Sequence, residues 1–349
     1  MYDVPTYLWI AFVVIVVVGL AVDLLAHKDD HVIGFKEAAA WSAGWVGLAI
    51  LWGVMIFILI EPSAGAGPDV GRFDAGLEYT TAWLLEKSLS VDNLFVFAVI
   101  FGYFKVPAEF QHRVLFYGVI GALVFRGIFL ALGVAVVSTF TFVLFGFAAL
   151  LLYSSFKLFF GGEGDDYDPG KSVAVRTLRK IYPTTEEYHG TAFFIKENGK
   201  RIATPLLAVV VAIEAADLIF AVDSVPAVLA VTSDPFIVYT SNAFAILGLR
   251  ALYFLLSGLL TKFHLLGKGV ALVLGFIGLK LTLQATHEVF VPGFGENVPT
   301  VPNLVSLAVI TLLLAGSIIL SIKFPLPPED EPESGLDTGA EQAASHKQL

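Results

Sequence analysis

The sequence contains no cysteine, only two methionines and seven histidines in 349 residues. The absence of cysteine excludes disulfides, thiolate metal sites and thiol redox chemistry. Because soft ligands are so scarce, any metal ion bound here is expected to be held by hard oxygen donors. The glycine-rich pieces "GAGPDVG" and "GGEG" lack the strand–loop–helix context of phosphate-binding loops. Nothing in the sequence indicates nucleotide or nucleic-acid binding.

Charged residues are also few, and apolar residues take their place. Hydrophobic residues make up 57% of the chain and charged residues 15%, with a mean hydropathy of +0.80. Soluble domains typically contain about 45–50% apolar residues. The composition therefore predicts an all-α polytopic protein embedded in a lipid bilayer. The first apolar block lacks a basic n-region and a cleavage pattern, so we expect it to be a retained helix.

Apolar blocks long enough to cross a membrane recur along the chain. A membrane helix needs about 20 apolar residues. Nine blocks qualify, at residues 7–25, 38–60, 76–104, 114–137, 139–160, 204–232, 236–260, 265–290 and 303–323. The polar loop 161–203 separates the fifth block from the sixth, and a small amphipathic helix is predicted in it near Val173–Ile181. The acidic tail at 324–349 is expected to be disordered.

The basic residues between the blocks predict the orientation. They fall on alternate linkers, and the opposite linkers hold only Arg72. By the positive-inside rule the N-terminus is expected outside and the C-terminus in the cytoplasm, in a multi-pass protein of the cytoplasmic membrane. The linker residues concerned are Lys28, Lys36, Lys105, Arg113, Lys171, Arg176, Arg179, Lys180, Lys196, Lys200, Arg201, Lys262, Lys268 and Lys323.

Two segments repeat one pattern. "EKSLSVDNLFVF" and "DLIFAVDSVPAV" each hold a carboxylate, five residues, an aspartate and a small polar residue. The matched positions are Glu86 with Asp217, Asp92 with Asp223, and Asn93 with Ser224. In the next helix of each copy, Arg126 matches Arg250. A third pair, "LFGFAALLL" and "VLGFIGLKL", carries Lys280 in the second copy alone.

The two copies begin three helices apart, which predicts inverted three-helix repeats at 75–160 and 204–291. An odd number of helices per repeat turns the second copy upside down, and inverted repeats with polar residues at the midplane are typical of transporters. The two helices within 1–60 and the helix at 302–323 would then be peripheral.

The repeat helices contain carboxylates, and placing a charged group inside a membrane costs several kcal/mol of free energy. These acidic residues are Glu86, Asp92, Glu214, Asp217 and Asp223, accompanied by the oxygen donors Asn93, Ser224, Ser241 and Asn242. One interpretation is static ion pairs, since charges inside membranes commonly pair with one another. The other is a cation site, because oxygen-rich sites suit Mg²⁺, Ca²⁺ and Mn²⁺. Composition does not choose among these metals.

Helix geometry restricts such a site. On an unbroken helix Asp217 and Asp223 lie about 120° apart and about 9 Å along the axis, and Glu214 faces away from Asp223. One compact site would need an interruption. Pro226 is predicted to provide it, because its ring removes the hydrogen bond to the carbonyl of Val222. Glu214 and Asp217 share a face and would line the path.

Basic residues in the repeat helices are predicted to compensate carboxylates or to act in gating. They are Arg126, Arg250, Lys280 and Lys87. The alternative for the arginines is a permanent ion pair. Lys87 points about 100° away from Glu86, so it is expected to pair with another helix or to snorkel. Asp23 is interpreted as a helix-end group.

Three segments resemble the TerC family of integral membrane proteins, in its Alx-like branch. They are "EKSLSVDNLFVF", "ATPLLAVVVAIEAAD" and "FAVDSVPAVLAVTSDPFIVYTSNAFAILGLRALYFLL", and the likeness runs from about residue 38 to 290. The resemblance implies manganese homeostasis, with Mn²⁺ efflux across the cytoplasmic membrane and a tellurium-resistance label. Its acidic motifs fall on Glu86, Asp92, Asn93, Glu214, Asp217, Asp223 and Ser224, and its further polar positions on Ser241, Asn242 and Arg250.

The sequence thus predicts an exporter of a divalent cation, with Mn²⁺ ahead of Mg²⁺ and Ca²⁺, no permanently bound cofactor, and protons as the coupling ion. No enzymatic activity is expected. One alternative is a non-transporting membrane partner that assists the assembly or metallation of other proteins through the loop 161–203. Another is an enzyme acting on an oxyanion such as tellurite, which the surplus of carboxylates and the lack of cysteine disfavour.

Overall fold

A computed structural model describes residues 2–26, 33–63, 73–160, 170, 172–197, 199–256, 265–290 and 297–324. These residues form eleven α-helices and two antiparallel pairs of short strands. The helices are α1 (Thr6–Ala26), α2 (Phe35–Leu59), α3 (Asp74–Phe104), α4 (Ala108–Thr139), α5 (Val143–Phe160), α6 (Val173–Ile181), α7 (Pro205–Leu229), α8 (Pro235–Leu247), α9 (Leu249–Leu256), α10 (Leu266–Val289) and α11 (Asn303–Lys323). Strand β1 (Tyr2–Asp3) pairs with β2 (Glu61–Pro62), and β3 (Phe194–Glu197) pairs with β4 (Lys200–Ala203).

The predicted class of helical membrane protein is confirmed. Seven helices are long and apolar enough to cross a membrane, and the bent pair α8–α9 makes eight. Each predicted apolar block overlaps one of these helices or α3. The 31-residue α3 exceeds the length of about 20 residues that a span needs. The predicted amphipathic helix is also confirmed as α6, where the hydroxyl of Ser172 caps the N-terminus by accepting from Val175 N at 3.2 Å.

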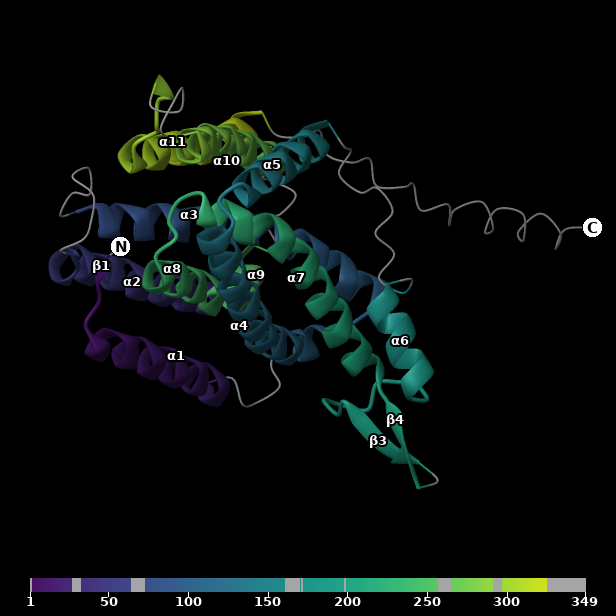
Figure 1. Cartoon of the computed structure of the whole chain (residues 1–349). Helices are drawn as coiled ribbons and strands as arrows, with labels where there is room; N and C mark the ends of the chain where they lie inside the picture. The colour runs from purple at the N-terminus through teal and green to yellow at the C-terminus, as the bar shows by residue number, and fades with distance from the viewer. Residues whose placement is uncertain are drawn as a thin grey trace, which may run out of the picture.

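Helices of one predicted repeat pack on helices of the other. Helix α3 packs on α8, α4 packs on α7, and α5 packs on α10. Figure 1 shows α5, α10 and α11 together along one side of the bundle, α1 at the opposite edge, and α3 between them. The first helix of each repeat, α3 or α7, thus contacts the second helix of the other repeat, α8 or α4. A twofold relation would produce this exchange, and the inversion itself stays a prediction.

The predicted interruption at Pro226 is wrong. Helix α7 runs without a break from Pro205 to Leu229 and contains this proline. Pro226 lies in the last turn, so the hydrogen bond that it removes affects only the end of the helix. The break lies in the next span, where α8 and α9 meet at Gly248 with a 40° bend.

Lys87 explains the position of this break. Its Nζ donates a hydrogen bond to the carbonyl of Ala245, at 3.2 Å, in the last turn of α8. A side chain that inserts beside the helical hydrogen-bond ladder is a known cause of kinks. A Cβ on Gly248 would stand 3.0 Å from Lys87 Nζ and 3.0 Å from Trp45 Cβ, so the glycine leaves room for the lysine. The side chain of Lys87 therefore does contact another helix, and its partner there is a backbone carbonyl of α8.

Gly248→Ala is expected to destabilise the protein by about 1–2 kcal/mol, because the added methyl group overpacks the space between Lys87 and Trp45. The measurement is the thermal unfolding temperature of the detergent-solubilised protein. Gly146→Ala on α5 is the matched control, since a Cβ there meets nothing within 4 Å. The control should be neutral or slightly stabilised. Equal unfolding temperatures for the two variants would contradict the assigned role of Gly248.

Candidate functional site

A buried group of charges lies where α3, α4 and α7 meet. Arg126 on α4 is 1% exposed and forms ion pairs with Glu86 on α3 and Asp217 on α7, which are 0% and 3% exposed. Its Nε donates to Asp217 Oδ2 at 3.1 Å and its Nη2 to Asp217 Oδ1 at 2.7 Å, a bidentate arrangement. The matched carboxylates of the two repeats therefore share one arginine. We call Glu86, Asn93, Arg126 and Asp217 the central cluster.

Asn93 belongs to this cluster through its side-chain amide. In the orientation that satisfies both polar groups, its oxygen accepts from Arg126 Nη2 at 3.0 Å and its nitrogen donates to the carbonyl of Leu89 at 3.1 Å. Glu86 and Asn93 are seven residues apart, which places them on one face of α3. Two carboxylates and one guanidinium leave one negative charge uncompensated within the cluster.

The two remaining acidic residues of α7, Glu214 and Asp223, face different helices, as the helix geometry predicts. Glu214 lies one turn before Asp217, and its carboxylate covers Gly121 on α4 so closely that a Cβ there would overlap it. The Oε2 atom of Glu214 is buried and has no hydrogen-bond partner in the part of the chain that the structure describes. Asp223 instead faces α5, where it accepts a hydrogen bond from Ser154 Oγ at 2.7 Å.

The other predicted ligands take different places. Ser224 and Asn242 are buried, and Ser224 Oγ and Asn242 Nδ2 lack partners among the described residues. The hydroxyl of Ser241 donates to the carbonyl of Val238, at 3.2 Å, within its own helix. The side chain of Asp92 lies outside the described part of the structure. Among the side chains that are described, no three His, Asp or Glu residues come together in a group able to hold a metal ion. The predicted ligand set stays a prediction.

Arg250 does not join the repeat carboxylates. It is 4% exposed and forms an ion pair with Asp23 on α1, which is 6% exposed. Its Nη2 also reaches the carbonyl of Asp23 at 3.5 Å. Asp23 does lie in the last turn of α1, as predicted, but its carboxylate is also buried against a guanidinium. Asp23 has a partner 227 positions away in the sequence, so no local pattern indicates it.

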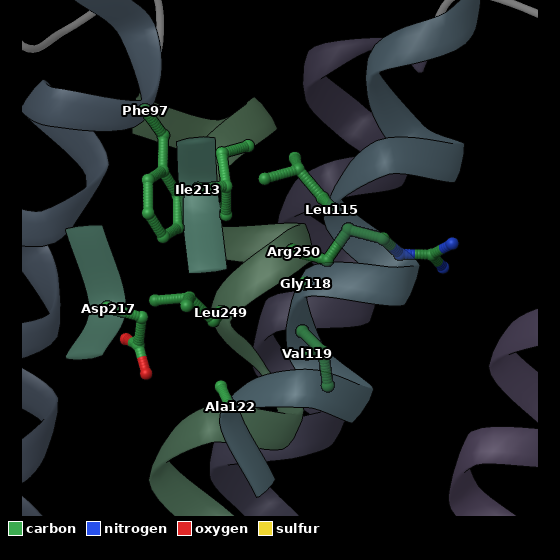
Figure 2. A pocket seen from close by; sticks show the side chains of 9 residues that line it. All are labelled: Phe97, Leu115, Gly118, Val119, Ala122, Ile213, Asp217, Leu249 and Arg250. Atoms are coloured by element: carbon green, nitrogen blue, oxygen red, sulfur yellow. The ribbon is translucent and has the colours of Figure 1, made fainter. Parts of the chain in front are cut away.

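A small cavity is lined by one member of the central cluster, Asp217, and one member of this ion pair, Arg250 (Figure 2). It is lined by Phe97, Leu115, Gly118, Val119, Ala122, Ile213, Asp217, Leu249 and Arg250, from α3, α4, α7 and α9. Asp217 and Arg250 supply its only charged side chains. Figure 2 shows the guanidinium of Arg250 pointing away from Asp217, while the aliphatic part of the side chain passes the cavity.

A second polar network surrounds Glu78 near the start of α3. Glu78 Oε1 accepts from Tyr2 Oη at 2.9 Å and from Asn303 Nδ2 at 3.3 Å, and Lys280 Nζ donates to Asn303 Oδ1 at 3.2 Å. Tyr2 N donates to Asp234 Oδ2 at 3.3 Å. Burial and the charge of Glu78 raise the pKa of the Tyr2 phenol, so it remains a donor. Lys280 thus serves this network. Glu78 is an acidic residue inside a predicted span, but it lies outside the repeated pattern, so the sequence does not indicate the network.

These observations define a class: a polytopic helical membrane protein that buries paired charges between its helices. The description "Integral membrane protein TerC family" matches residues 72–325, and the chain belongs to that family. The matched range begins after α1 and α2, so Asp23 lies outside it.

The chain is similar to curated proteins over most of their length. It is 42% identical over 90% of its length to "Uncharacterized membrane protein STKORF319" of Myxococcus xanthus, of which 92% is covered. It is 43% identical over 81% of its length to "Putative membrane-bound redox modulator Alx" of Escherichia coli strain K12, of which 87% is covered. An "Uncharacterized membrane protein" of Rickettsia bellii is 37% identical over 88% of this chain and 95% of its own. No solved structure matches.

Proposed function

We propose that this protein transports a divalent cation across the cytoplasmic membrane and exports Mn²⁺ from the cytoplasm. The observation that carries the proposal is the central cluster, where Glu86 and Asp217 share Arg126 and leave one negative charge uncompensated. Charged side chains inside membranes are costly, and they commonly mark ion pathways. The choice of Mn²⁺ over Mg²⁺ and Ca²⁺ comes from the resemblance to the TerC family.

The cluster offers the ligands that such a cation needs. Glu86 and Asp217 supply carboxylate oxygens, and Asn93 supplies an amide oxygen now held by Arg126. An arriving cation would take over these oxygens from the guanidinium. Mg²⁺, Mn²⁺ and Ca²⁺ all accept carboxylate and carbonyl oxygens, so the cluster is suited to hard divalent ions. Arg126 then acts as the internal cation that occupies the site between transport events.

Export also needs a driving force. Moving two positive charges out against an inside-negative potential of about 100 mV requires about 4.6 kcal/mol. We propose proton antiport as the coupling. Glu214 is the candidate carrier, because its carboxylate lies beside Asp217 and has a buried oxygen without a hydrogen-bond partner among the described residues. A carboxylate that holds either a proton or part of the cation shell would exchange the two.

The test is Mn²⁺ accumulation in proteoliposomes containing the purified protein, with and without a pH gradient. Glu86→Gln and Asp217→Asn are each expected to reduce transport about tenfold or more, since charge-assisted contacts contribute about 1.5–3 kcal/mol. Glu187→Gln is the control, an exposed carboxylate in the loop 161–203 that should transport normally. Transport that ignores the pH gradient would refute proton coupling. Folded wild-type protein that accumulates no Mn²⁺ would refute the transporter.

The second candidate is a non-transporting partner that assists the assembly or metallation of other membrane proteins. It is favoured by the folded structure within 161–203, where α6 and the β3–β4 hairpin project from one end of the bundle (Figure 1). Under this proposal, changes to the hairpin abolish function while Asp217→Asn does not. The E. coli relative carries the word redox in its name, but this chain has no cysteine for thiol exchange. A tellurium phenotype would follow indirectly from disturbed metal levels.

A further inference from the structure

We propose that Ser154 on α5 is a positioning residue that holds Asp223 as a second carboxylate for the transported cation, apart from the central cluster. The inference rests on the proposed cation transport and extends it to a residue that lies outside the repeated segments. One of its two tests measures metal binding and does not depend on transport.

Asp223 is separated from the central cluster by the geometry of α7. It follows Asp217 by six residues, which turns the two carboxylates about 120° apart on one helix. Asp217 faces α4, where Arg126 pairs with it, and Asp223 faces α5. The side chain of Asp223 is half-buried, which leaves it accessible to water. The two motif aspartates of α7 therefore serve different places in the bundle.

The hydroxyl of Ser154 holds Asp223 from the facing helix. Its Oγ donates to Asp223 Oδ1 at 2.7 Å, a charge-assisted hydrogen bond. Hydroxyls inside helices commonly donate to a carbonyl of their own helix, as Thr80 does to Gly76. Ser154 instead reaches across to α7. Among the described residues Asp223 Oδ2 has no hydrogen-bond partner, so this oxygen is available to a cation.

The next residue, Ser155, helps to fix the helix that presents Ser154. Its Oγ donates to the carbonyl of Ala271 on α10 at 2.7 Å. A Cβ on Gly275 would stand 2.8 Å from this Oγ, so α5 and α10 approach each other closely at small residues. Helix α5 is therefore attached to α10, and the Ser154 hydroxyl is in place before a cation arrives. The two neighbouring serines have different partners, which allows their roles to be separated.

Asp223 and Ser154 suit a divalent ion that keeps most of its water. Mg²⁺, for example, binds through one or two carboxylates and retains several waters. Asp223 Oδ2 can bind the ion, and the hydroxyl oxygen of Ser154 carries lone pairs that can join the shell. The positive charge of Lys157, three residues further along α5, acts on Asp223 and compensates it when no cation is bound. Asp223 is therefore a second station for the hydrated ion.

The first test is Mn²⁺ transport in proteoliposomes. Ser154→Ala is expected to raise the Mn²⁺ concentration for half-maximal transport about tenfold, the usual order for a lost hydrogen bond to a charged group. Ser154→Thr keeps the hydroxyl and should behave like wild type. Ser155→Ala is the matched control, which should lower the unfolding temperature and leave the half-maximal concentration unchanged. A wild-type value for folded Ser154→Ala would overturn the proposal, as would an equal rise for Ser155→Ala.

The second test measures Mn²⁺ binding in detergent, as the rise in unfolding temperature that a ligand of the folded state produces. Asp217→Asn leaves Glu86 and Arg126 as a neutral pair, so the rise that remains in this variant reports Asp223. Adding Ser154→Ala should raise the Mn²⁺ concentration needed for this rise about tenfold, and adding Ser155→Ala should not.

The outcomes separate this proposal from the proposed function. If wild type shows the rise and Asp217→Asn shows none, the second station is overturned while the central cluster is unaffected. If Asp217→Asn retains a rise that depends on Ser154 but wild type does not transport, the station stands as a binding site and transport is refuted. A wild type without any rise would overturn both.

Discussion

Replacing Arg126 with glutamine is expected to destabilise the folded protein by about 3–5 kcal/mol, the usual effect of removing one partner from a buried ion pair. Glu86 and Asp217 would remain buried as two neighbouring negative charges without compensation. Asn93 would also lose the donor that satisfies its amide oxygen. Arg126→Lys should recover only part of the loss, since an ammonium group cannot reproduce the bidentate contact with Asp217.

Unfolding temperature in detergent measures this effect, and a second substitution separates charge from packing. Adding Asp217→Asn to Arg126→Gln removes one of the two unpaired carboxylates, so the double variant should be more stable than Arg126→Gln alone. Arg113→Gln on the same helix is the matched control. Arg113 donates to Thr191 Oγ1 at 2.6 Å and is only half-buried, so little change is expected. An Arg126→Gln protein as stable as the control would show that the central cluster does not support the fold.

Local patterns predicted the helices and part of the central cluster. The apolar blocks and the amphipathic run at Val173–Ile181 depend on residues that are near one another in the chain, so their periodicity is readable directly. The repeat match paired Glu86 with Asp217 and Arg126 with Arg250, and three of these four residues lie in the central cluster. The pattern did not show that one arginine serves both carboxylates. That pairing depends on how α3, α4 and α7 pack.

Contacts between distant segments could not be predicted in the same way. The equivalent motif positions led to the expectation that Arg250 acts as Arg126 does, but its partner is Asp23 on a helix without repeat equivalent. The break in the second copy was assigned to Pro226 by a local rule. It lies at Gly248, because Lys87 from α3 binds the carbonyl of Ala245 there. Both differences arise from side chains that approach from another helix.

Gly121→Ala is expected to leave the fold intact and to reduce Mn²⁺ transport about tenfold, the equivalent of about 1.4 kcal/mol in binding. The added methyl group would occupy the position of the Glu214 carboxylate. Because this carboxylate is the end of a flexible side chain, it can turn aside while the backbone stays in place. Glu214 would then leave its place beside Asp217, and the proposed exchange of proton and cation would fail although every charge is still present.

The matched control for this substitution is Gly127→Ala on the same helix. A Cβ at Gly127 would meet Tyr239 Cε1 at 3.9 Å, an ordinary van der Waals distance, so transport and stability should both stay normal. Unfolding temperatures are measured alongside transport for both variants. A Gly121→Ala protein that transports like the control would show that the position of Glu214 is irrelevant to the cycle. Reduced transport with an unchanged unfolding temperature would instead place Glu214 beside Asp217 during transport, because a methyl group alters geometry without altering charge.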